Sequence, residues 1–101
     1  MRRVAILAAG SVLLAFGSAA MADGESIYKS GTSPTCASCH DRGTAGAPMV
    51  NKPADWEGIE LDSQTLVEST LSGKGAMPTY EGRVDKEEIV AAIEYMISTV
   101  E

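Results

Sequence analysis

The clearest pattern in the chain is a helical repeat of apolar residues near its C-terminal end. The segment Asp85-Lys86-Glu87-Glu88 has the form of an acid-capped helix start, with Glu88 at the third helical position. Apolar residues then recur three and four positions apart, at Ile89, Val90, Ala92, Ile93, Met96, Ile97 and Val100. This spacing predicts an amphipathic helix that runs almost to the end of the chain.

A second helix is predicted over residues 63–72. Asp62 precedes it as a suitable N-cap, and Gly73 follows it as a typical helix end. The inward-facing positions of this helix would be Leu66, Val67, Thr70 and Leu71.

The rest of the chain shows weaker signals. Asp23 can cap a short helix that buries Ile27 and Tyr28 and stops at Gly31, and residues 54–56 can form a helical turn. The other stretches contain Gly and Pro and predict loops. Because no segment alternates as a strand does, the pattern predicts an all-α domain.

The first 22 residues have the composition of a cleaved export signal. A basic start, Met1-Arg2-Arg3, is followed by an apolar run from Val4 to Phe16 and by Ala20-Met21-Ala22, the small-x-small pattern of a signal peptidase site. The apolar run is shorter than the ~20 residues that a membrane-spanning helix needs. We expect cleavage before Asp23 and a periplasmic domain over residues 23–101 without a membrane anchor; a retained anchor is the alternative.

The predicted mature domain is acidic. The whole chain has a net charge of −6, and loss of Arg2 and Arg3 with the signal makes it −8. Such a surface repels nucleic acid and anionic membranes and would attract a partner with a basic docking face. Alternatively, the charge serves only to keep the protein in solution.

The segment Cys36-Ala37-Ser38-Cys39-His40 carries the most specific chemistry. Two cysteines at this spacing, followed directly by histidine, form the attachment signature of c-type haem. Each thiol would add to one vinyl group of the haem, and His40 would bind the iron axially. A thioredoxin-like pair, half of a zinc site and a simple disulfide are the alternatives, but the chain lacks a βαβ pattern and offers only one His beside its two Cys.

Three further residues are candidates for the same site. Met77 lies in the loop Lys74-Gly75-Ala76-Met77-Pro78, where core packing is not its obvious use, and its thioether could bind the iron opposite His40. The Pro48 carbonyl could accept the second ring N–H of His40. Trp56 could pack on the haem edge and donate its indole N–H to a propionate, although Trp56 as plain core is nearly as good an interpretation.

Taken together, these motifs resemble class I cytochrome c over essentially the whole predicted mature chain. Gly46-Ala47-Pro48, Trp56 and Gly73-Lys74-Gly75-Ala76-Met77-Pro78 are similar to the small bacterial cytochrome c5 type. The resemblance implies about four short helices and loops wrapped around one covalently bound haem. It also implies Cys36 and Cys39 as thioether links, His40 and Met77 as axial ligands, and terminal helices that cross near Gly24, Tyr28 and Tyr95.

The resemblance implies a periplasmic single-electron carrier, not an enzyme, with redox proteins as partners. Two alternatives stay open, namely a permanent haem c subunit of a periplasmic oxidoreductase and, in third place, a haem enzyme or gas sensor. The chain departs from the family in a longer gap between Tyr28 and Cys36, which predicts that the loop over residues 30–35 bulges outward. The second cysteine pair of some c5 proteins is absent.

Overall fold

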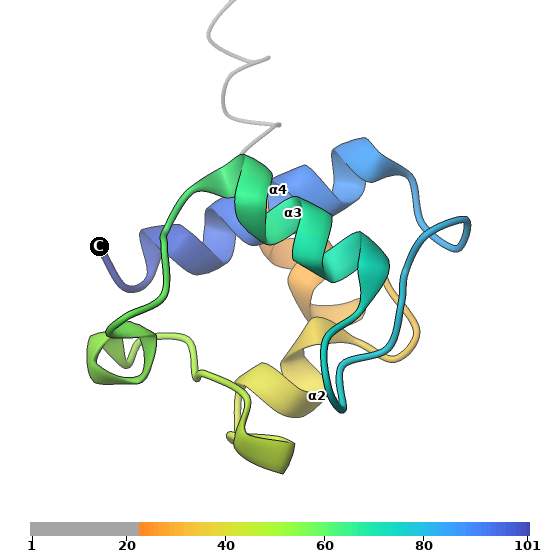
Figure 1. Ribbon diagram of the computed structural model, residues 1–101. Coiled ribbons are helices and arrows are strands. Elements are labelled where there is room, and N and C mark those ends of the chain that lie inside the picture. The colour runs from red at the N-terminus through yellow and green to blue at the C-terminus, as the bar shows by residue number, and fades with distance from the viewer. Residues whose placement is uncertain (1–22) are drawn as a thin grey trace, which may run out of the picture.

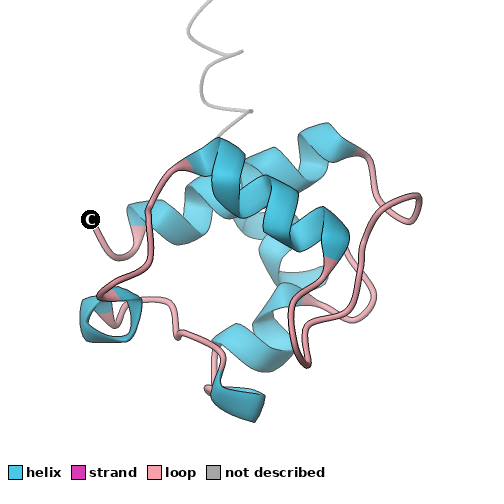
Figure 2. Cartoon of the chain, viewed as in Figure 1, coloured by secondary structure: helices cyan, strands magenta, loops and turns pink. Residues whose placement is uncertain are grey.

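The computed structural model describes residues 23–101, and the predicted export signal lies outside the described residues. Residues 23–30 are helical. The later elements are α2 (Cys36–His40), the 3₁₀ helices η1 (Thr44–Gly46) and η2 (Pro53–Trp56), α3 (Ser63–Ser72) and α4 (Lys86–Ser98). Figure 1 shows α3 and α4 beside each other, with α2 at the opposite side of the fold. Within the described residues all regular elements are helical (Figure 2), as the sequence predicts.

The helix α3 has the predicted bounds because both of its ends are specified locally. The carboxylate of Asp62 accepts hydrogen bonds from the Thr65 amide at 3.0 Å and the Thr65 hydroxyl at 2.8 Å. These bonds lower the pKa of Asp62. At the other end, Gly73 has φ +85°, a conformation that L side chains rarely adopt.

The helix α4 begins at the predicted place but without the predicted cap. The side chain of Asp85 makes no capping hydrogen bond. Its backbone carbonyl instead accepts from the amides of Glu88 at 3.0 Å and Ile89 at 3.2 Å. The start of this helix therefore follows from the backbone and from burial of the apolar face, not from a capping box.

The sequence pattern did not predict α2 or η1. Only five residues form α2, too few for an apolar period to show, and none of them is fully buried. Thr35 caps this helix, because its side chain accepts from the Ser38 amide at 3.2 Å. The turn after it ends in η1, where Gly43 has φ +75° and Ala45 φ +55°.

The core joins the N-terminal helix, α3 and α4. Its buried residues are Tyr28, Trp56, Val67, Tyr80, Ile89, Ala92, Ile93, Met96 and Val100. The N-terminal helix crosses α4 at Gly24, where an added Cβ would lie 2.6 Å from the Ala91 carbonyl oxygen. One turn later the rings of Tyr28 and Tyr95 pack with centroids 5.3 Å apart. The terminal helices thus cross near the three residues that the sequence indicated.

The loop at residues 30–35, before Cys36, is held against the fold by hydrogen bonds, so the predicted outward bulge is only partly confirmed. Gly31, Ser33 and Pro34 are exposed, but Thr32 is 8% exposed. The carbonyl of Pro34 accepts hydrogen bonds from the hydroxyl of Thr32 at 2.8 Å and of Tyr80 at 2.6 Å. Two buried hydroxyls therefore hold this loop against the fold.

The crossing at Gly24 gives a direct test of the helix packing. Gly24→Ala should lower the free energy of unfolding by about 1–3 kcal/mol, because the added methyl overpacks against a backbone carbonyl of α4. The exposed Ser26→Ala on the same helix should change it by less than about 0.5 kcal/mol. Denaturant unfolding of both variants measures the difference, and equal stabilities would contradict the close crossing.

Candidate functional site

The helix α2 places both thiols and the imidazole on one short rigid element. Cys36 and Cys39 are one helical turn apart, so their side chains lie on the same side of the helix. Both are free, half-buried thiols and both line one cavity. Burial raises the pKa of the Cys36 thiol, which keeps it protonated at neutral pH before any reaction.

The orientation of His40 is fixed by the chain that follows it. Its Nδ1 lies 2.7 Å from the carbonyl oxygen of Pro48, the contact that the sequence suggested. A carbonyl oxygen can only accept, so Nδ1 must carry the proton and donate it. The lone pair of Nε2 is then free for a metal ligand bond.

Trp56 supports this histidine in a way that the sequence did not predict. Its indole N–H donates to the Met49 carbonyl at 2.8 Å, so this hydrogen is not free for a propionate. The Trp56 and His40 rings are inclined by 28° with centroids 6.4 Å apart. Trp56 is buried, lines the same cavity as His40 and holds the loop that carries Pro48.

A tight turn presents Met77. Lys74 and Met77 exchange two backbone hydrogen bonds, each 3.0 Å long, around Gly75, which has φ +60°. The chain after Met77 returns to the end of α3, where the Tyr80 amide donates to the Thr70 carbonyl at 3.4 Å and the Glu81 amide to the Leu71 carbonyl at 3.2 Å. The position of Met77 is therefore determined by backbone pairing on both sides.

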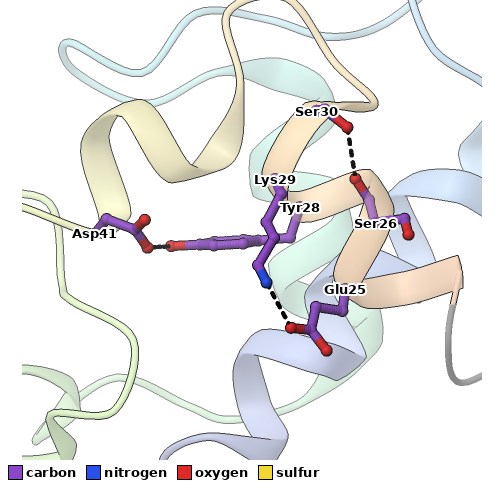
Figure 3. A network of polar contacts seen from close by, with 6 residues as sticks. All are labelled: Glu25, Ser26, Tyr28, Lys29, Ser30 and Asp41. Carbon is purple, nitrogen blue, oxygen red and sulfur yellow. Dashed lines mark hydrogen bonds and ion pairs between the residues drawn. The ribbon is translucent and has the colours of Figure 1, made fainter.

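A buried phenol joins the N-terminal helix to the end of α2. The hydroxyl of Tyr28 donates to the carboxylate of Asp41 at 2.5 Å (Figure 3). Burial, followed by this carboxylate, raises the pKa of Tyr28, so the phenol stays neutral. The same helix carries an exposed Glu25–Lys29 ion pair at 2.7 Å, which contributes little to stability.

Sequence reasoning missed three supports of the site, namely Asp41, Tyr80 and Asp55, whose carboxylate accepts a hydrogen bond from the Met49 amide. For the first two the reason is distance along the chain. Asp41 follows His40 directly, but its partner Tyr28 lies 13 residues away, and Tyr80 reaches Pro34 across 46 residues. No local pattern shows contacts of this range. Only the position of Asp41 beside a candidate ligand could have drawn attention to it.

Two adjoining cavities meet at the candidate ligands. The helix-side cavity, of about 330 Å³, is lined mainly by apolar side chains, among them Leu66, Ile89, Ile93 and Met96. The loop-side cavity, of about 390 Å³, is lined by both cysteines and by residues of the loops at 44–48 and 74–78. The residues that line both cavities are Cys36, His40, Pro48, Lys74 and Met77.

These residues fit a covalently held haem. The space is apolar, two thiols border it, and His40 and Met77 supply a nitrogen and a sulfur at the same cavities. Within residues 23–101, no group of three His, Cys, Asp or Glu side chains is arranged to hold a bare metal ion. The donor set therefore suits a haem, which brings four nitrogen ligands of its own and would need only one or two more from the protein.

Comparison with known proteins identifies the family. Residues 19–96 match the family model described as cytochrome c oxidase, cbb3-type, subunit III. The chain belongs to the c-type cytochromes, and within them to the small class I proteins, which carry one covalently attached haem c and transfer electrons. The predicted class, fold and cofactor are confirmed, and the c5 subgroup stays a prediction.

Relatives and solved structures support this assignment over most of the chain. A cytochrome c-551 from Halorhodospira halochloris is 68% identical over 79 residues, which are 78% of this chain and 100% of the relative. The NMR structure of reduced Ectothiorhodospira halophila cytochrome c551 is 64% identical, with a TM-score of 0.73 over 76% of this chain and 99% of that one. A crystal structure of an electron transfer complex of nitrite reductase with cytochrome c matches with 31% identity and a TM-score of 0.67, over 78% of this chain and 95% of that one.

Proposed function

We propose that this cytochrome is a periplasmic single-electron carrier with its haem bound through Cys36 and Cys39 and its iron held by His40 and Met77. The observation that carries the proposal is the hydrogen bond from Nδ1 of His40 to the Pro48 carbonyl at 2.7 Å. It leaves Nε2 as the free imidazole donor, beside cavities that are also lined by the two thiols and by Met77.

The residues of the chain have separate tasks in this arrangement. Cys36 and Cys39 would hold the haem through thioether bonds to its two vinyl groups, in which each sulfur bonds one vinyl carbon and the thiol hydrogen passes to the other. His40 and Met77 would hold the iron from both sides, which would leave no open position for a substrate and favours a carrier over an enzyme or gas sensor. When bound, haem supplies a one-electron couple whose potential is raised by histidine–methionine ligation.

The role of Met77 can be tested by its removal. Met77→Ala should abolish the weak far-red absorption band of a sulfur ligand in the oxidised protein and lower the reduction potential, because the thioether that favours the reduced iron is lost. Met96→Leu replaces a buried methionine that lines the helix-side cavity but is not a candidate ligand, so it should keep the band and change the potential less than Met77→Ala does. Absorption spectroscopy and redox titration make the measurement. A band that survives in Met77→Ala, or ready binding of carbon monoxide by the reduced wild type, would contradict the ligand assignment.

Export is proposed from the sequence of the first 22 residues. Their basic start, apolar run and small-residue site suit cleavage before Asp23 and delivery to the periplasm. Among the residues that the structure describes, no helix is long and apolar enough to cross a membrane.

Redox proteins with a basic docking face are the proposed partners. A structural neighbour is a cytochrome c in complex with nitrite reductase, which supports a redox protein as the kind of partner. The acidic surface of this chain would guide a basic partner from a distance. The described residues that line the loop-side cavity include no Asp or Glu and one lysine, Lys74. The acidic side chains of the described residues therefore lie outside the lining of this cavity.

Steering by the acidic surface predicts that the rate of association with a basic partner depends on the salt concentration. The association rate with a basic redox partner should fall steeply between about 0.01 and 0.1 M salt, where the Debye length shrinks from about 30 to about 10 Å. Stopped-flow electron transfer at pseudo-first-order conditions measures the rate. An association rate that stays constant or rises with salt would contradict charge steering.

A permanent subunit of an oxidoreductase is the second candidate function. It is favoured by the description of the matching family model as an oxidase subunit. A free carrier is favoured by the cytochrome c-551 relative, because the match covers the whole length of that small protein.

Gel filtration of protein purified from its native source without detergent distinguishes these candidates. We expect elution as a small monomer, because Ile59 and Leu61 are the only large apolar side chains of residues 23–101 that are exposed. Haem-containing material that elutes only with larger subunits would instead support the permanent complex.

A further inference from the structure

The loop that follows η1 connects His40 to η2 through two consecutive peptide groups. The first joins Pro48 to Met49. Its carbonyl accepts from Nδ1 of His40 at 2.7 Å, and its N–H donates to the carboxylate of Asp55 at 3.1 Å. One planar peptide group therefore lies between a carboxylate and the imidazole.

The second peptide group joins Met49 to Val50 and makes a parallel connection. Its carbonyl accepts from the indole N–H of Trp56 at 2.8 Å, and its N–H donates to the backbone carbonyl of His40 at 3.0 Å. The side chain and the backbone of His40 are thus each linked to a neighbouring residue of η2. This double link fixes the loop in position and in tilt.

We propose that Asp55 is a positioning residue for His40, which acts through the peptide group between Pro48 and Met49. A carboxylate that accepts from the amide N–H draws the amide hydrogen toward itself and increases the negative charge on the carbonyl oxygen of the same group. The carbonyl then binds the Nδ1 hydrogen of His40 more strongly, and Nε2 becomes a better electron donor. Asp55 in this way stabilises the oxidised iron, in so far as His40 is the axial ligand proposed above.

The surroundings of Asp55 suit this role. Its side chain is 28% exposed, less than that of the neighbouring Lys52 at 58%, whose ammonium lies 3.7 Å from the second carboxylate oxygen. One oxygen therefore faces the Met49 amide while the other meets a cation at the surface. The Trp56 ring lies beside the imidazole, with the two centroids 6.4 Å apart, on the same 3₁₀ helix as Asp55.

The test compares the loss of this carboxylate with the loss of an ordinary surface charge. Asp55→Asn keeps an oxygen that can accept from Met49 but removes the charge. Glu57→Gln removes one negative charge at an exposed position two residues further along. Both holoproteins are studied by redox titration and, in the reduced diamagnetic state, by NMR of the Nδ1 proton and nitrogen of His40.

We expect Asp55→Asn to raise the reduction potential more than Glu57→Gln does and to shift the His40 Nδ1 proton upfield, while Glu57→Gln leaves that proton unchanged. Asp55→Ala, which removes the acceptor as well, should enlarge the proton shift and speed its exchange with solvent. Equal potentials for Asp55→Asn and Glu57→Gln with an unchanged Nδ1 signal would overturn the proposal.

Different measurements test the ligand role of His40 and the positioning role of Asp55. A wild-type protein whose His40 ring signals show no haem-induced shifts would contradict the ligand role of His40 and the Asp55 proposal together. Normal haem-induced shifts, with Asp55→Asn indistinguishable from Glu57→Gln, would overturn the Asp55 proposal alone.

Discussion

The arrangement of the site depends on one hydrogen bond, from Nδ1 of His40 to the carbonyl of Pro48. It selects the tautomer of the imidazole, because a carbonyl cannot donate, and it sets the plane in which the ring lies. Without it, either ring nitrogen of His40 could carry the proton, and no hydrogen bond to the loop would set the plane of the ring. The loop at 48–50, η2 and the buried Trp56 are all arranged so that this carbonyl stays in place.

The cavities beside His40 also explain how so short a domain keeps a core. Small domains bury too little apolar surface to be stable alone and usually recruit a cofactor, a metal or disulfides. Here the apolar side chains of α3 and α4 that line the helix-side cavity face a space that this chain does not fill itself. A covalent haem would fill it, and attachment through Cys36 and Cys39, as proposed above, would use both cysteines of the chain, so that the cofactor would take the place of a disulfide framework.

The sequence could predict those parts of the fold whose causes are local. The bounds of α3 follow from Asp62 and Gly73, and the apolar spacing of α4 predicts its buried face. The five residues of α2 carry no such period, and the acid cap of α4 was predicted but is not formed. At the site, residue types and spacing indicated the donors, whereas the supports were hidden because Tyr28 and Tyr80 reach partners 13 and 46 residues away.

The two candidate axial ligands are held by separate parts of the chain, and this separation suits electron transfer. His40 is fixed by α2, the loop at 48–50 and η2, whereas Met77 is fixed by its own tight turn and by pairing with the end of α3. Since neither support depends on the other candidate ligand, each would keep its place when the charge on a bound iron changes. A fast electron carrier requires that its ligands move little between redox states. Here the backbone hydrogen bonds that hold the loops at 48–50 and 74–78 would limit such movement.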